Sequence, residues 1–237
     1  MRRRTQKWLR KWHRRLGVLV GIQLFFWTLG GTYFAWFPID DVRGTSDRTP
    51  PQKVDLAVIT QWYPIDSLIS QLSHAVYRVE IRTLLGKPVY LFFKDQDHVT
   101  LIDAQTGITL SPISQELAQQ IARQDFKHNV PIREVTLVTQ KRGEYKGPIP
   151  AYRISFDYWK GTNVYVHALS GLVTAHRNSI WRGFDFLWML HILDFHEREN
   201  FNNWLLRLAS VLGLITILSG YGLWFITRPR GRKHQAS

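Results

Sequence analysis

The sequence predicts an α+β protein in which two transmembrane helices flank a domain of two similar helix-plus-antiparallel-sheet units. Three features lead to this prediction: two long runs without a charged residue, basic segments beside each run, and an internal repeat between them. Residues 16–37 and 208–226 contain no Asp, Glu, Lys or Arg. Because a helix of about 20 residues crosses roughly 30 Å of bilayer hydrocarbon, we expect spans at residues 16–37 and 204–226.

The formal net charge of +13 comes from the segments that flank the predicted spans. Residues 1–15 carry eight Lys and Arg and no acid, and residues 227–237 carry four more. All eighteen acidic residues lie between Asp40 and Glu199, where basic residues balance them. Basic flanks favour the cytoplasmic side, so we expect a cytoplasmic head and tail and a periplasmic central domain on a bacterial inner membrane. This distribution argues against a nucleic-acid partner.

The first apolar run is predicted to be an uncleaved signal anchor. It is longer than the apolar body of a signal peptide, and bulky residues 33–37 occupy the place where cleavage would need small ones. The chain contains no cysteine. This excludes disulfides, thiol redox chemistry and cysteine-ligated iron–sulfur clusters.

Small residues recur at helical spacing in both predicted spans. The first span has two such pairs, Gly17 with Gly21 and Gly31 with Ala35. In the second span the small residues are Ala209, Gly213, Thr216 and Gly220. Such stripes let helix backbones approach closely, so we expect helix–helix contact. A glycine-lined face that makes room for a flat cofactor is the alternative.

Between the spans, a linker over residues 38–55 is predicted to precede two units, residues 56–112 and 113–180. Asp, Gly, Ser and Pro dominate the linker. Each unit is expected to hold a helix and three antiparallel strands. The helices are expected over residues 65–75, with Asp66 as the cap, and from Ser114 to Asp125. The strands are expected at residues 77–82, 89–93 and 100–109, and at residues 134–139, 151–156 and 163–174.

The third strands of the two units match in detail. Residues 101–107 read LIDAQTG, and residues 165–171 read YVHALSG, sixty-four positions later. In each copy a glycine, Gly107 or Gly171, stands where a tight turn requires a positive φ. This match is the main support for an internal repeat.

The helix and strands that end in residues 102–108 (IDAQTGI) resemble a PepSY unit, and residues 166–173 resemble a second, more diverged copy. Residues 12–17 (WHRRLG) resemble the first helix of PepSY-associated transmembrane proteins. Residues 190–202 (LHILDFHERENFN) resemble the segment before the last span of that group. The resemblance covers nearly the whole chain.

This resemblance implies a role in iron acquisition. Larger relatives have four or more spans, bind b-type haem through histidines and reduce ferric iron or ferric siderophores. Small two-span relatives are associated with ferrous uptake through reduction of ferric iron. The present chain departs from the larger pattern because it has two predicted spans.

His13 lies three residues before the first apolar run and is a candidate axial ligand of haem b. Neutral imidazole binds haem iron, and membrane haem usually takes two such ligands. One chain offers no second histidine on this side of the bilayer, but a symmetric homodimer would supply one. The alternative is a solvated histidine that touches lipid phosphate.

The predicted interfacial segment, residues 181–203, carries a second candidate site. Its aromatic first half is followed by a dense group of imidazoles and carboxylates: His191, Asp194, His196, Glu197 and Glu199. Ferric iron prefers hard carboxylate oxygens, so this group is predicted to hold iron as a substrate. His191 or His196 would alternatively bind an outer-leaflet haem. A charged interfacial turn without a metal is the simpler interpretation.

Two functional hypotheses follow. The first is an electron-transfer protein that reduces ferric iron outside the membrane, with a cytoplasmic-side electron donor and a ferrous-iron transporter as partners. The second is a non-catalytic, membrane-anchored PepSY module that binds an envelope partner such as a peptidase or transporter. No phosphate-binding glycine loop, Rossmann fingerprint or Gly-x-Ser-x-Gly motif is present.

Overall fold

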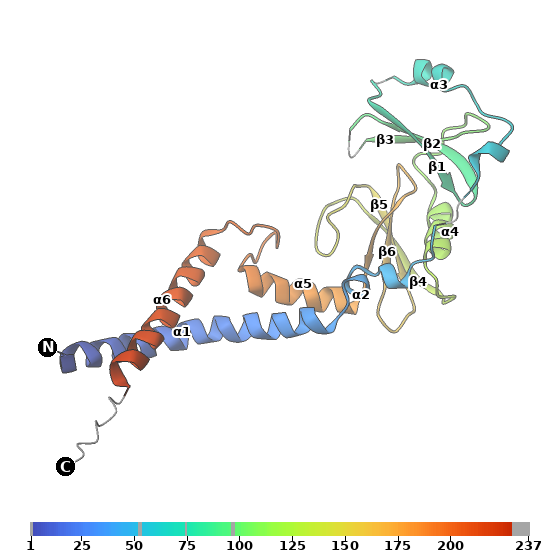
Figure 1. The fold of residues 1–237 in the computed structure, drawn as a ribbon. Coiled ribbons are helices and arrows are strands. Elements are labelled where there is room, and N and C mark those ends of the chain that lie inside the picture. Colours follow the sequence, from blue (N-terminus) through green and yellow to red (C-terminus); the bar gives the residue numbers. More distant parts are fainter. Residues whose placement is uncertain (1, 52–53, 74, 96–97, 229–237) are drawn as a thin grey trace, which may run out of the picture. The chain divides into compact units, whose positions relative to one another are not determined.

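The computed structural model describes residues 2–51, 54–73, 75–95 and 98–228 (Figure 1). The chain divides into two compact units. A helical unit comprises Met1–Trp36 and Gly183–Ser237, and a sheet unit comprises Phe37–Arg182. Most of the predicted basic tail, from residue 229 onward, lies outside the described residues.

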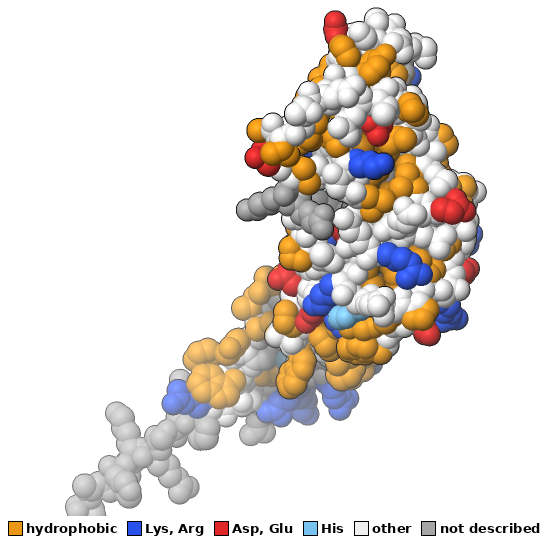
Figure 2. Space-filling view, turned by 90° about the vertical axis from the view of Figure 1, so that its right-hand side faces the viewer, with side chains coloured by type: hydrophobic (Ala, Val, Ile, Leu, Met, Phe, Trp, Pro, Cys, Tyr) orange, Lys and Arg blue, Asp and Glu red, His pale blue; other side chains and the backbone are white. Residues whose placement is uncertain are grey.

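The helical unit contains two helices long and apolar enough to cross a membrane, which suggests membrane association. Helix α1 runs from Arg2 to Trp36, and α6 runs from Trp204 to Thr227. The stretches that satisfy length and hydropathy are Gln6–Trp36 and Trp204–Thr227. Helix α1 begins well before the expected residue 16 because Arg, Lys and Gln are good helix formers and no breaker precedes the apolar run. Hydrophobic side chains gather over this helical part, the lower part of Figure 2.

The small residues of α6 pack against α1. A Cβ placed on Gly213 would lie 4.0 Å from the Val20 side chain, and one on Gly220 would lie 3.2 Å from the His13 ring. By contrast, no described atom lies within 4 Å of the position of a Cβ on Gly17 or Gly21. The expected close approach of helices therefore uses the stripe on α6.

A third helix, α5 (Ser179–Ile192), occupies the first half of the segment predicted to be interfacial. Its residues from Gly183 onward belong to the helical unit and lie along the end of α1. The rings of Phe34 and Phe184 are 4.5 Å apart, and a Cβ on Gly183 would lie 2.5 Å from the Tyr33 hydroxyl. Glycine at position 183 thus permits close contact with α1.

The sheet unit opens with short helices where a linker was expected. Helix α2 (Ile39–Arg43) and 3₁₀ turns at Thr45–Asp47 and Leu56–Val58 occupy this region. The first helix of the repeat, α3, is Ile65–Gln71, and Pro64 stands at its N-cap without a side-chain hydrogen bond. Asp66 lies in the first turn and is not the cap, which corrects the expectation.

Two antiparallel sheets follow, with strands paired in sequence order. The first sheet contains β1 (Arg78–Leu84), β2 (Lys87–Phe93) and β3 (Val99–Asp103). Helix α4 (Gln115–Asp125) comes next, and the Ser114 side chain accepts a hydrogen bond from Leu117 N, as expected for a cap. The second sheet contains β4 (Ile132–Val138), β5 (Ala151–Phe156), β6 (Asn163–His167) and β7 (Val173–Arg177).

The second sheet has four strands and not three. Residues 163–174 were expected to form one strand, but the chain turns back after His167 and β7 pairs with β6. The turn is the one that the repeat predicted. The amide of Gly107 donates to Asp103 O, and the amide of Gly171 donates to His167 O, both at 2.9 Å. The φ angles of the two glycines are 74° and 67°.

The two sheets share one core around α4. Buried side chains of β2 and β3, such as Leu91 and Leu101, pack in the same cluster as Ile154 and Val164 from β5 and β6. Helix α4 contributes Ala118, Ile121 and Ala122 to this cluster. The remaining faces form smaller clusters under α3 and beside Tyr145.

Candidate functional site

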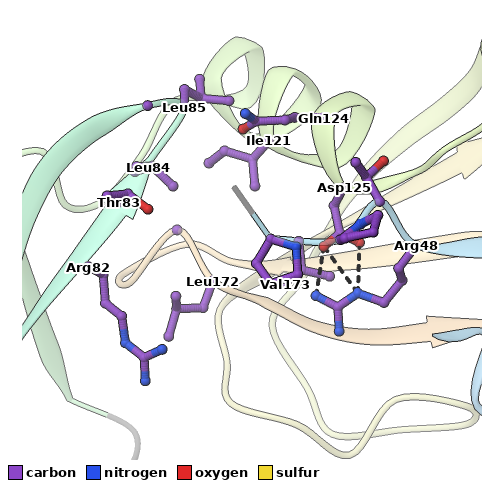
Figure 3. Close-up of a pocket in the computed structure, with 15 residues that line it drawn as sticks. Arg48, Arg82, Thr83, Leu84, Leu85, Ile121, Gln124, Asp125, Leu172 and Val173 are labelled. Carbon is purple, nitrogen blue, oxygen red and sulfur yellow. Dashed lines mark hydrogen bonds and ion pairs between the residues drawn. The ribbon is translucent and has the colours of Figure 1, made fainter. Parts of the chain in front are cut away.

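A groove of about 430 Å³ lies in the sheet unit where the β1–β2 hairpin, the end of α4 and the β6–β7 turn come together (Figure 3). Its apolar lining includes Leu84, Leu85, Ile121, Leu172 and Val173. Arg48, Arg82, Gln124 and Asp125 supply the polar side chains. The β6–β7 turn approaches closely because Gly171 has no side chain; a Cβ there would lie 3.3 Å from Leu84.

Asp125 connects the wall of this groove to the interior of the sheet unit. Arg48 donates to Asp125 through Nε and Nη2, with a shortest distance of 2.7 Å. On the other side, His176 Nε2 lies 2.5 Å from Asp125 Oδ2, and the His176 side chain is buried. Burial alone would raise the pKa of Asp125, but the hydrogen bonds from His176 and Arg48 outweigh it and lower that pKa.

A second buried carboxylate, Asp47, lies next to Arg48 in the chain. Lys160 Nζ is 2.9 Å from Asp47 Oδ2, and His128 Nε2 is 2.9 Å from Asp47 Oδ1. Burial would raise the pKa of Asp47, and the hydrogen bonds from Lys160 and His128 lower it below its usual value. Both carboxylates are therefore held ionised at neutral pH.

Further hydrogen bonds fasten the first residues of the sheet unit to the end of α4 and to the residue after β7. Thr49 N donates to Asp125 O at 2.6 Å, and Lys127 N donates to Asp47 O at 3.0 Å. Asn178 directly follows β7, and its side chain is fully buried and donates a hydrogen bond to Asp41 O at 2.9 Å. The two connections of the sheet unit to the rest of the chain are thus joined to each other.

His13 lies in the helical unit with one ring nitrogen engaged. Its Nδ1 is 2.7 Å from Ser219 Oγ, and its Nε2 would be 3.8 Å from a Cβ on Gly220. A groove of about 420 Å³ adjoins Gly220 and is lined by Ile217, Tyr221 and Trp224. A histidine oriented through one nitrogen beside an apolar groove fits the donor set of one axial haem ligand.

His191 lies near the end of α5 among aromatic rings. The rings of Trp27, Phe34 and Trp188 have their centres within about 6 Å of its ring, and Trp188 is parallel to it. Burial lowers the pKa of His191. Its Nδ1 is buried and has no hydrogen-bond partner among the described residues. Three neighbouring rings leave the imidazole little open face, so His191 fits a haem ligand less well than His13.

The residues of the iron site expected at positions 191–199 lie in different surroundings. Asp194 closes a turn, since its two carboxylate oxygens accept the backbone amides of residues 196, 197, 199 and 200. These amides lower the pKa of Asp194 to about 2. His196, Glu197 and Glu199 belong to exposed positions of the turn. Within the described residues, no three His, Asp or Glu side chains are placed to hold a metal ion.

The segment that holds α4 and β4–β7 is the part of the chain that matches a known domain family. Residues 112–177 match the PepSY family. The family model is described as the peptidase propeptide and YPEB domain. No curated protein and no solved structure gives a match to this chain.

The PepSY domain supplies one wall of the groove. Ile121, Gln124 and Asp125 come from its helix, and the β6–β7 turn is its last hairpin. The opposite wall comes from the first sheet, which precedes the matched residues. The groove therefore lies along one border of the PepSY domain.

Sequence reasoning missed Arg48, Asp125 and His176. The two contacts of Asp125 join residues 77 and 51 positions apart. No local spacing reveals such pairs. The available signal was weaker: Asp125 ends the predicted helix of the second unit, and His176 lies two residues after its last predicted strand.

Proposed function

We propose that the protein is a membrane-anchored PepSY module that binds an extended apolar segment of an envelope partner in the groove of its sheet unit. The observation that carries this proposal is the groove itself, formed where the PepSY domain meets the first sheet. The two candidate membrane helices would hold the module at the surface of the inner membrane, on its periplasmic side.

The groove suits an extended segment because a sheet edge borders it. Strand β1 is the outer strand of the first sheet, and its other edge pairs with no strand of the described chain. Arg82, Thr83 and Leu84 of this strand line the groove. A peptide added to a free edge gains backbone hydrogen bonds, and neighbouring pockets select its side chains. Here the apolar lining would select apolar side chains.

The kind of partner follows from the family description, which names peptidase propeptides. An envelope peptidase is therefore the first partner to test, and a transporter is the second. Arg82 is paired with Glu80 and Arg48 with Asp125. Because these charges are already balanced, apolar contact and backbone pairing would supply most of the affinity.

A position-specific crosslink tests the proposal. The chain has no cysteine, so Thr83→Cys introduces a single thiol in the groove and Ile108→Cys introduces one at an exposed turn outside it. Each full-length variant is labelled in cells with a photoreactive maleimide. We expect a discrete protein adduct from Thr83→Cys that Ile108→Cys does not give, with the partner's crosslinked peptide identified by mass spectrometry. The same adducts from both positions, or none from either, would refute the groove as a binding site.

Electron transfer to ferric iron is a second candidate function, and one observation favours it. His13 is held by Ser219 through Nδ1, and its Nε2 would lie 3.8 Å from a Cβ on Gly220, one of the residues that line the groove. A bound haem b would supply one-electron chemistry, with His13 from each copy of a homodimer as the two axial ligands. Ser219 would orient the imidazole and keep Nε2 unprotonated. Each ferric ion outside would take up one electron supplied by a cytoplasmic-side donor, and a ferrous-iron transporter would take up the product.

Absorption spectra of purified full-length protein test this second candidate. We expect a reduced-minus-oxidised Soret and α band that His13→Ala abolishes and Ser219→Ala shifts, while the His176→Ala control keeps it. A colourless protein, or bands that persist in His13→Ala, would exclude His13 as a haem ligand. Unchanged ferrous-iron production by cells with His191 and His196 replaced by Ala would remove the outer iron site.

A further inference from the structure

The apolar runs of α1 (residues 16–37) and α6 (residues 208–226) are shifted relative to each other along the helix axes. His13 contacts Ser219, Val20 lies beside Gly213, and Trp27 lines the same groove as Leu205. These contacts set the antiparallel register of α1 and α6. Helix α6 therefore begins level with Trp27, although α1 continues to Trp36. At about 1.5 Å per residue, the last nine residues of α1 extend about 14 Å beyond the start of α6.

A bilayer that covered residues 16–37 would therefore enclose the loop before α6. This loop, residues 193–203, carries four ionisable side chains in a row, from His196 to Glu199, and the ionised Asp194. Its backbone is irregular, and its Asp and Glu side chains are too short to reach the headgroups from within the hydrocarbon, so both features are excluded from a lipid-exposed position there. The loop lies at the level of Trp27, so the hydrocarbon must end there.

We propose that the outer surface of the bilayer meets the helical unit at the level of Trp27 and Trp204. The last turns of α1, with the part of α5 that lies along them, then form a two-helix stalk outside the hydrocarbon. The interaction surface is an aromatic belt, and its partner is the headgroup region of the outer leaflet. This proposal does not depend on the groove or on haem.

Exposed aromatic side chains mark the outer rim. Phe195, Phe201 and Trp204 are 50%, 57% and 72% exposed. Aromatic rings favour the headgroup level, where an apolar face and a polar edge are both satisfied. Phe195 lies within the turn closed by Asp194, and Phe201 and Trp204 follow that turn. The belt therefore coincides with the charged loop, as a bilayer surface at this level requires.

The inner rim lies at the right distance. Trp204 and Trp224 are twenty residues apart in α6, or about 30 Å, the thickness of the hydrocarbon core. Trp8, at the matching level of α1, is 61% exposed. Arg10, Lys11, Arg14 and Arg15 of α1 then lie about 3–10 Å inside this rim. Side chains of a helix lean toward its N-terminus, so these Lys and Arg extend toward the cytoplasmic surface.

The end of α5 is built for a position at this rim. Its last carbonyls accept side-chain donors from other elements: Leu190 O from Gln23, His191 O from Trp27 and Ile192 O from Asn203, at 2.8–3.0 Å. A helix end in water needs no such donors, whereas one next to hydrocarbon must satisfy each carbonyl internally. The hydrogen bond to Leu190 O explains why the polar residue Gln23 stands in the apolar run.

Thiol labelling along α1 tests the level of the bilayer. Single cysteines replace Phe25 and Thr32, both on exposed positions of α1, and Ile108→Cys reports on the sheet unit. Full-length variants in intact cells are treated with a membrane-impermeant maleimide. If Ile108→Cys reacts only in inverted vesicles, the comparison is made there, because the proposal concerns depth and not orientation.

We expect Thr32→Cys to react at a rate within about threefold of Ile108→Cys, and Phe25→Cys at least tenfold more slowly. Reaction of all three in detergent normalises their intrinsic reactivity. A rate for Thr32→Cys as low as that of Phe25→Cys would place residue 32 in hydrocarbon and overturn the proposal. A rate for Phe25→Cys as high as that of Thr32→Cys would also overturn it.

Discussion

Replacement of Lys160 by Met should destabilise the sheet unit more than any other single lysine change in its described part. Lys160 Nζ lies 2.9 Å from Asp47, and the side chains of the pair are 10% and 4% exposed. Met keeps the apolar stem and removes only the ammonium group. Loss of one partner from a buried pair costs about 3–5 kcal/mol, because the other charge stays buried. His128 still contacts Asp47, so we expect the lower end, about 3 kcal/mol.

This loss is large enough to measure in the full-length protein. For a chain of this size, 1 kcal/mol corresponds to about 2–4 °C in Tm, so the expected decrease is about 6–12 °C. Near-UV circular dichroism in detergent follows the unfolding. The matched control is Lys94→Met at an exposed position, which should stay within about 0.5 kcal/mol of the parent.

A double variant separates pairing from packing. Asp47→Asn with Lys160→Met removes both charges, so its loss of stability should be smaller than the sum of the two single losses. Equal Tm values for Lys160→Met and the Lys94→Met control would refute the buried pair. A double variant whose losses add would show that Lys160 and Asp47 act independently.

Three further changes test other parts of the sheet unit and the loop. The pKa of Asp125 is lower in the folded protein than in the unfolded chain, where it is about 4. Its contribution to stability is therefore present above pH 4 and is lost as the pH falls from 4 towards its folded pKa. Asp125→Asn should make Tm depend less on pH between pH 4 and 2. Gly107→Ala should destabilise by at least about 1 kcal/mol more than Gly86→Ala, because both positions have a positive φ but only Gly107 has a ring, that of Tyr63, 2.7 Å from the added Cβ; equal Tm values would contradict this. Asp194→Ala should increase amide hydrogen exchange at residues 196–200, and unchanged protection would show that the carboxylate does not hold the turn.

Much of the fold was readable from local patterns. The Ser114 cap, the helix over residues 115–125 and the turns at Gly107 and Gly171 were predicted and are confirmed. These features depend on residues a few positions apart, where propensity and turn chemistry decide. The fourth strand was missed because residues 163–174 were assigned to one β-rich strand although a turn was expected at Gly171; in the structure the chain reverses there and β7 pairs with β6.

The candidate sites were harder to predict because their contacts are not local. His191 and Asp194 are three residues apart, yet Asp194 caps backbone amides and His191 lies among Trp and Phe rings. Spacing in the sequence suggested a shared ligand set only because a continuous helix was assumed. Helix α5 ends at Ile192, and Leu193 has a positive φ of 53°, so the chain changes direction between the two residues.

The contact between Asn178 and Asp41 has a mechanical consequence. The buried side-chain amide of Asn178 contacts both segments that connect the sheet unit to the rest of the chain. Its nitrogen donates a hydrogen bond to Asp41 O, and its oxygen accepts one from Trp181 N at the start of α5. A force applied to either connecting segment is therefore shared by both segments. The two connections therefore act as one attachment, and a load on the sheet unit is carried by two segments of the chain.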